Sequence, residues 1–132
     1  MTLTASVILL TLFIAEAQAQ AAEPVLLDLF CDGTKKKESG TTEPIRKLHL
    51  GLDFKEKTLA GFALVAQIDS LTDATITFSA HAARDGGTVS VIGYVDRLTG
   101  AVWATSVRQE GDNEITGAET YDLSCKITDR LL

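Results

Sequence analysis

Apolar and polar residues alternate with a period of two along most of this chain, beginning at about residue 25. Successive side chains of a β-strand point to opposite faces of a sheet, so this alternation predicts strands with one buried face. The segment 48–54 is typical, because Leu48, Leu50 and Leu52 alternate with polar or small residues. No stretch combines the period of about 3.6 residues with helix caps, and the pattern therefore predicts an all-β protein.

Turn signals separate the alternating segments. Asp-Gly and Gly-Gly at 85–87 suit the positive φ angles of a hairpin turn. In the turn at 96–100, Asp96 is expected to accept hydrogen bonds from the turn backbone, Gly100 to take a positive φ, and Arg97 to pair with a neighbouring carboxylate. The polar stretches 34–44, 55–58 and 110–114 are expected to be loops, and 68–73 a short connection.

These turns leave about seven strands, at approximately 25–31, 48–54, 59–66, 75–79, 89–95, 102–107 and 121–127. Short turns between consecutive strands favour an antiparallel meander. Strands of this number and spacing are typical of a small barrel or sandwich.

The chain has two cysteines, Cys31 at the end of the first predicted strand and Cys125 within the last. In an oxidising compartment such a pair usually forms a disulfide. The alternative is a catalytic or metal-binding pair, but the chain has no C-x-x-C motif and neither cysteine has a histidine nearby in sequence. We therefore expect an inward disulfide that joins the first strand to the last, worth roughly 4–5 kcal/mol in the chain-entropy view.

Residues 3–15 form an apolar run that is followed by small residues with overlapping A-x-A sites. This pattern predicts a secretory signal peptide at 1–19 and a single β domain at 20–132, in the periplasm or secreted. The run is shorter than the ~20 residues of a membrane span, so no stable span is expected. It also lacks a basic N-terminal region, and a buried or membrane-anchoring helix is the alternative.

The chain carries 12 basic and 18 acidic residues, a net charge of −6. Such a balance disfavours nucleic acid as a partner, because phosphates attract clustered Lys and Arg. The sequence has no G-x-S-x-G or H-x-x-x-H motif, and the histidines His49 and His81 are expected to be surface residues. We therefore expect no cofactor, no metal and no catalytic residues, and so a protein that is not an enzyme.

Five aromatic residues at strand spacing are expected to belong to the core or, if the barrel is hollow, to line its cavity: Phe62, Phe78, Tyr94, Trp103 and Tyr121. If they are exposed, Trp103 and Tyr94 are the candidates for contacts with a partner or ligand. Arg97, in the neighbouring turn, is the third candidate.

Three blocks resemble a group of small exported bacterial proteins of uncharacterised function: LFCDG at 29–33, GYVDRLTG at 93–100 and YDLSCK at 121–126. That resemblance implies a bacterial periplasmic or secreted protein. The chain is more loosely similar to the periplasmic lysozyme inhibitors of the C-type class, which are small antiparallel barrels with an early and a late cysteine joined. Their inhibitory loop has a Ser-Gly-x-x-Tyr pattern, whereas the segment 79–84 lacks the Gly and the Tyr, so no site residue is carried over.

Three functions remain as hypotheses. The first is a non-catalytic binding or accessory protein of the cell envelope, with an envelope protein as its partner. The second is an inhibitor of a hydrolase such as lysozyme, since an acidic protein suits a basic target. The third is a carrier of a small apolar ligand inside the barrel.

Overall fold

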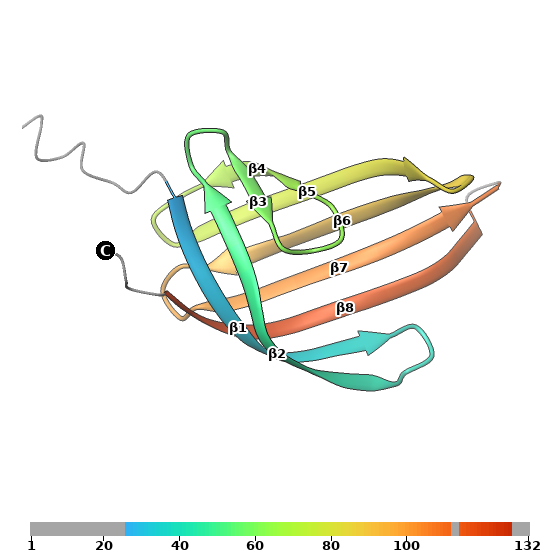
Figure 1. Ribbon diagram of the computed structural model, residues 1–132, viewed down its shortest axis with the longest axis horizontal. Helices are drawn as coiled ribbons and strands as arrows, with labels where there is room; N and C mark the ends of the chain where they lie inside the picture. The colour runs from blue at the N-terminus through green and yellow to red at the C-terminus, as the bar shows by residue number, and fades with distance from the viewer. Residues whose placement is uncertain (1–25, 112–113, 128–132) are drawn as a thin grey trace, which may run out of the picture.

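The computed structural model describes residues 26–111 and 114–127, and the predicted signal peptide at 1–19 lies outside them. In the described residues, eight strands form a closed barrel in which each strand pairs with the next and β8 pairs with β1 (Figure 1). The strands are β1 (Leu26–Lys37), β2 (Thr42–Asp53), β3 (Thr58–Ala60), β4 (Ala66–Leu71), β5 (Thr75–Arg84), β6 (Gly87–Asp96), β7 (Ala101–Glu110) and β8 (Glu114–Ile127). The described part of the chain contains no helix long and apolar enough to cross a membrane.

All neighbouring pairs are antiparallel, so the predicted all-β antiparallel meander is confirmed. The closed barrel decides between the two predicted forms, and the eight strands described differ little from the expected seven.

The extra strand comes from the segment 59–66, which was predicted to be continuous. β3 ends at Ala60, the chain bends through 61–65, and β4 then covers much of the predicted connection at 68–73. At the break, Gly61 has a φ of 135°, and a Cβ there would lie 2.5 Å from the carbonyl oxygen of His49. The unbroken apolar run therefore contains a loop that packs inward and not one buried strand.

The predicted loop at 34–44 is also wrong. β1 continues to Lys37 and β2 begins at Thr42, so that only 38–41 form the turn. Polar residues remain in the strands because inward-facing Lys35 and Lys37 form ion pairs with Glu43 across the hairpin.

Inward side chains fill the middle of the barrel. The largest fully buried ones are Phe78, Leu50, Leu52, Leu59, Ile76, Val91 and Val102. On β6 the alternation is clear, because Val91 and Val95 are buried while the intervening Ile92 and Tyr94 are exposed.

Cys31 and Cys125 are direct partners across β1 and β8, with Cα atoms 4.0 Å apart, and they form the predicted disulfide. The bond is buried and joins residues 94 positions apart, the first strand to the last. A disulfide of this kind indicates an oxidising, non-cytoplasmic compartment.

The barrel has two ends that differ in chemistry. We call the first the apolar end; it contains the start of β1, the end of β8 and the turns at 54–57, 72–74 and 97–100. It lies on the left in Figure 1. We call the second the polar end; it contains the turns at 38–41 and 85–86 and the loop at 61–65.

Candidate ligand-binding site

A pocket of about 460 Å³ opens at the apolar end, between the barrel core and the turn at 97–100. Its floor consists of inward side chains of the core, Leu29, Leu52, Ile76 and Val95, each no more than 5% exposed. Leu98 and Ile127 line its mouth and are 79% and 65% exposed. The core is therefore accessible from this end through a pocket that is mostly apolar.

The turn at 97–100 has the hydrogen bonds that the sequence predicts. Asp96 Oδ1 accepts hydrogen bonds from the backbone N–H groups of Leu98 at 2.9 Å and Thr99 at 3.2 Å. These hydrogen bonds, that from Leu98 first, lower the pKa of Asp96. Gly100 has a φ of 82°, as expected, and its N–H donates to the Asp96 carbonyl at 2.9 Å.

The same turn is attached to its neighbours on both sides. The Arg97 N–H donates to the Ala74 carbonyl at 2.8 Å, and its guanidinium Nη1 donates to the Thr72 carbonyl at 2.8 Å. On the other side, the Cys125 N–H donates to the Gly100 carbonyl at 2.8 Å. The expected pairing of Arg97 with a carboxylate is wrong, because its described partner is a backbone oxygen. These bonds hold the rim of the pocket in one arrangement.

Exposed hydrophobic side chains occur at this end of the barrel, and two of them, Leu98 and Ile127, line the pocket. Leu26 begins β1, Leu71 ends β4, Leu98 lies in the turn, and Ile127 ends β8, and all four are exposed. These four strand ends and turns lie at the same end of an antiparallel barrel. The apolar end therefore has both an apolar pocket and an apolar rim.

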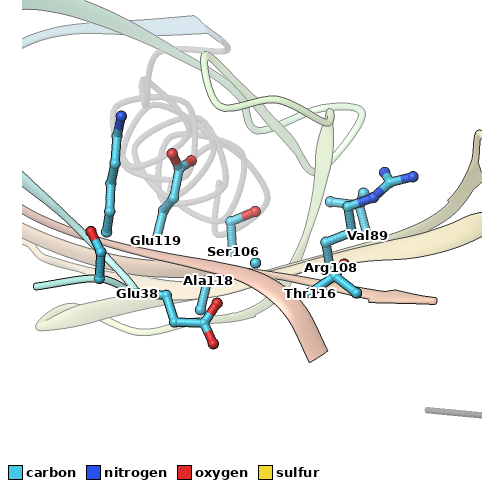
Figure 2. Close-up of a pocket in the computed structure, with 10 residues that line it drawn as sticks. Glu38, Val89, Ser106, Arg108, Thr116, Ala118 and Glu119 are labelled. Atoms are coloured by element: carbon cyan, nitrogen blue, oxygen red, sulfur yellow. The ribbon is translucent and has the colours of Figure 1, made fainter. Parts of the chain in front are cut away.

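The polar end has a groove of about 430 Å³ with different walls. Lys37, Glu38 and Ser39 line one side, and inward side chains of β7 and β8 line the other. Figure 2 shows the side chains of Glu119, Ser106 and Arg108 rising from the same face of the sheet. Val89 and Ala118 also line this groove, but most of its lining side chains are charged or carry a hydroxyl group.

Most of these charges are paired with one another. Lys35 Nζ lies 3.4 Å from Glu119 and 3.6 Å from Glu43, and Lys37 Nζ lies 3.0 Å from Glu43. The hydrogen bond and charge of Lys37 lower the pKa of Glu43. Burial lowers the pKa of Lys35, but the attraction of Glu119, Tyr121 and Glu43 outweighs it, and the pKa is raised overall.

Arg108, the other groove-lining cation, is also engaged. Its Nη2 donates to the carbonyl oxygens of Arg84 and Asp85 and lies 3.4 Å from Glu110. The groove therefore has few unpaired charges among the described residues.

Three aromatic rings pack together on the polar side of the core. Phe62, in the loop at 61–65, lies 5.8 Å from Phe78 of β5 and 5.1 Å from Tyr121 of β8, between ring centroids. Burial raises the pKa of the Tyr121 hydroxyl, and Glu119 adds to the effect. The loop thus closes the polar end of the core with an aromatic side chain, and the apolar end has no such closure among the residues described.

The candidate contact residues occupy different places. Tyr94 and Trp103 are cross-strand partners on the outer face of the barrel, with ring centroids 6.0 Å apart. Neither ring lines the pocket, whereas Arg97 does. The other three predicted core aromatics, Phe62, Phe78 and Tyr121, belong to the interior.

Three residues that were not predicted to form a site also line the pocket: Leu98, Ile127 and Lys126. Leu98 carried a usable signal, because a large aliphatic residue is unusual in a tight polar turn. No local pattern marks the other two, since the closure of the barrel places them there.

Both histidines lie at the surface, as expected. His49 Nε2 lies 2.7 Å from Asp28 Oδ1, and His81 Nδ1 lies 2.7 Å from Ser90 Oγ. In the described residues, no group of three or more His, Cys, Asp or Glu side chains is arranged to hold a metal ion.

The chain matches no protein-family model, no curated protein and no solved structure. The resemblances noted in the sequence therefore stay predictions.

Proposed function

We propose that this protein is a non-catalytic binding protein of the periplasm or the secreted fraction, and that it holds a small apolar molecule at the apolar end. The observation that carries the proposal is the open pocket over the core floor. Ligand sites are typically concave, about 300–1,000 Å³ in volume, and mostly apolar with a few polar groups. The volume of about 460 Å³ and the lining both meet this description.

The polar groove is the weaker candidate for a ligand. Its cations already have carboxylate or carbonyl partners, so a ligand would have to replace existing contacts to gain new ones. Each exposed ion pair contributes little to stability. A ligand that replaces several of them with similar contacts therefore gains little binding free energy. The apolar pocket requires no such exchange, because burying apolar ligand surface there only removes it from water.

The compartment in the proposal has two supports. The disulfide persists in an oxidising environment, and the N-terminal sequence has the features of a signal peptide. Detection of the mature N-terminus after residue 19 in exported protein would test this part.

Titration with N-phenyl-1-naphthylamine, a neutral apolar probe that fluoresces when bound, tests the binding function. We expect saturable binding at one site. Leu98→Glu should weaken it at least tenfold by placing a charge at the mouth. Ile92→Glu is the matched control, because Ile92 is also exposed but lies on the outer wall. No saturable binding, or equal losses in both variants, would overturn the proposal.

A second candidate, an inhibitor of a basic hydrolase, is favoured by the net charge of −6. A lysozyme assay with excess mature protein tests it directly. Inhibition that saturates at micromolar protein and weakens with added salt would support this candidate. Unchanged lysozyme activity would exclude lysozyme as the target.

A further inference from the structure

The geometry points to a specific class of ligand for this pocket, a single-chain amphiphile whose anionic head group binds Arg97 while its tail lies on the aliphatic floor. This inference rests on the proposed function and adds the chemistry of the ligand to it. Three features carry it: the position of the guanidinium, its free hydrogen-bonding capacity, and the division of the lining into an apolar floor and a charged rim.

The guanidinium is held in place at the rim. The backbone of Arg97 is bonded to Ala74 and its Nη1 to the carbonyl oxygen of Thr72, both at 2.8 Å. Both acceptors belong to the turn at 72–74, which has its own hydrogen bonds through the Thr72 side chain. A guanidinium anchored in this way loses little conformational freedom when it binds a ligand.

The same guanidinium keeps most of its donors. An arginine side chain has five N–H groups in a planar fork that suits carboxylate and phosphate oxygens. Among the described residues, the Thr72 carbonyl is the one acceptor of the Arg97 side chain, and no carboxylate forms an ion pair with it. Arg97 thus differs from Arg108 of the polar groove, which has a carboxylate partner.

The other charges at the rim are consistent with an anionic head group. Lys126 adjoins the pocket, but it pairs with exposed Phe30 across β1 and β8, and this register places it on the outer face of the barrel. Asp96 is the acidic residue of the lining, but both its hydrogen bonds come from the turn backbone. The rim therefore has the guanidinium of Arg97 and one carboxylate, and that carboxylate is committed to the turn.

The floor determines the rest of the molecule. Leu29, Leu52, Ile76 and Val95 present aliphatic side chains alone, so the part of the ligand in contact with them is apolar. A volume of about 460 Å³ lies in the lower half of the usual range for ligand pockets, which favours one chain over a two-chain lipid. Since the protein has a net charge of −6, an anion gains nothing from long-range attraction, and contact with Arg97 has to provide the selectivity.

Competition against the neutral probe tests the inference, with decanoate, 1-decanol and decyltrimethylammonium as competitors of equal chain length. We expect decanoate to bind about tenfold more tightly than decanol, as a charge-assisted hydrogen bond implies. The cationic amphiphile should be the weakest. Arg97→Gln should abolish the preference for decanoate and leave decanol unchanged, whereas Arg97→Lys should retain part of it.

Arg84→Gln is the matched control, because it removes an exposed arginine at the polar end. Its ligand preference should equal that of the unmodified protein. If the probe and decanol bind but decanoate has no advantage, or if Arg97→Gln keeps the advantage, the inference is wrong and the apolar site stands. If neither the probe nor any amphiphile binds, the proposed function itself is wrong.

Discussion

The two ends of the barrel are built from the same strands but differ in whether the described residues cover the core. At the apolar end the core side chains form the floor of an open pocket, with Leu98 exposed at its mouth. At the polar end the ring of Phe62 covers the core, and a layer of paired charges lies beyond it. A binding site for an apolar ligand is therefore expected at the first end.

The difference arises within single strands. On β1 the inward positions begin with Leu27, Leu29 and Cys31 and continue with Lys35 and Lys37. On β8 they change from Glu119 and Tyr121 to Leu123 and Cys125 in the same spatial direction. The period of two is constant, whereas the polarity of the inward side chains changes halfway along the barrel.

The largest expected effect is that of the disulfide, which lies in the apolar half. Replacing both Cys31 and Cys125 by serine should lower the free energy of unfolding by about 4 kcal/mol, because the bond closes a loop of 94 residues. Urea denaturation measures this change. Reduction of the unmodified protein should give the same loss, and unchanged midpoints in both cases would show that the bond contributes little.

The next effect tests the closure of the polar end. Phe62→Ala should cost about 2–3 kcal/mol, because the ring packs against two other aromatic rings from an otherwise short loop. Val65→Ala in the same loop is the control and should be close to neutral, since Val65 is 63% exposed. Equal costs for the two variants would contradict the role of Phe62 as the cover of the core.

A third comparison uses one glycine from a turn at each end. Gly100 and Gly86 both have a φ of 82°, but a Cβ at Gly100 would lie 2.5 Å from the Cys125 carbonyl oxygen, whereas one at Gly86 has open space around it. Gly86→Ala should cost about 1 kcal/mol for the backbone alone. Gly100→Ala should cost about 2 kcal/mol or more, because the turn must also move away from β8.

Thermal or urea unfolding of both glycine variants measures the difference. A larger cost at Gly86 than at Gly100 would mean that the contact between the turn at 97–100 and β8 does not hold the rim.

The smallest effect is a loss of stability at alkaline pH that arises at the polar end. The raised pKa of Lys35 means that the folded state binds its proton more tightly than the unfolded state does. Its contribution is complete below the unfolded value of 10.5 and is lost as the pH rises through the folded value. Tyr121, whose pKa is also raised, has the same sign.

Lys35→Met should therefore reduce the loss of stability above about pH 10, by less than about 1 kcal/mol because the pairs are partly exposed. Urea unfolding at neutral and alkaline pH measures it. The difference between Lys35→Met and Lys126→Met, a lysine variant at the apolar end, isolates the contribution of the ion pairs of Lys35. A larger loss of stability at alkaline pH in Lys35→Met than in the unmodified protein would contradict the prediction.

Local patterns in the sequence predicted much of this structure. The alternation in 48–54 and 89–95, the Asp96 hydrogen bonds and positive φ of Gly100 in the turn, and the cysteine pair appear as expected. Each of these features depends on residues close in sequence or on simple pairing, whereas the partner of Arg97 lies 25 residues away. The errors fall at 34–44 and 59–66, where composition was misleading. Polar residues at 34–37 remain in a strand because they pair with β2 and β8. The apolar run breaks at Gly61, which lies against the carbonyl oxygen of His49 on β2.

The pocket was less predictable than the fold. Arg97 was a candidate on the basis of its turn, but the aliphatic floor beneath it comes from β1, β2, β5 and β6. In the sequence, those residues have the pattern of ordinary core positions. The alternation of a strand does not indicate which of its inward residues will line a pocket at the end of the barrel.

By itself, the sequence determined that strands form, which of their faces is buried, where tight turns occur and that the two cysteines can join. These features follow from side-chain alternation, from the backbone preferences of Gly and Asp, and from thiol chemistry. Only the tertiary structure decided that the meander closes, that Phe62 covers one end and that the described residues form a pocket beside Arg97 at the other. Closure depends on the stagger of all the strands together, and that is a property of non-local pairing that no single segment carries.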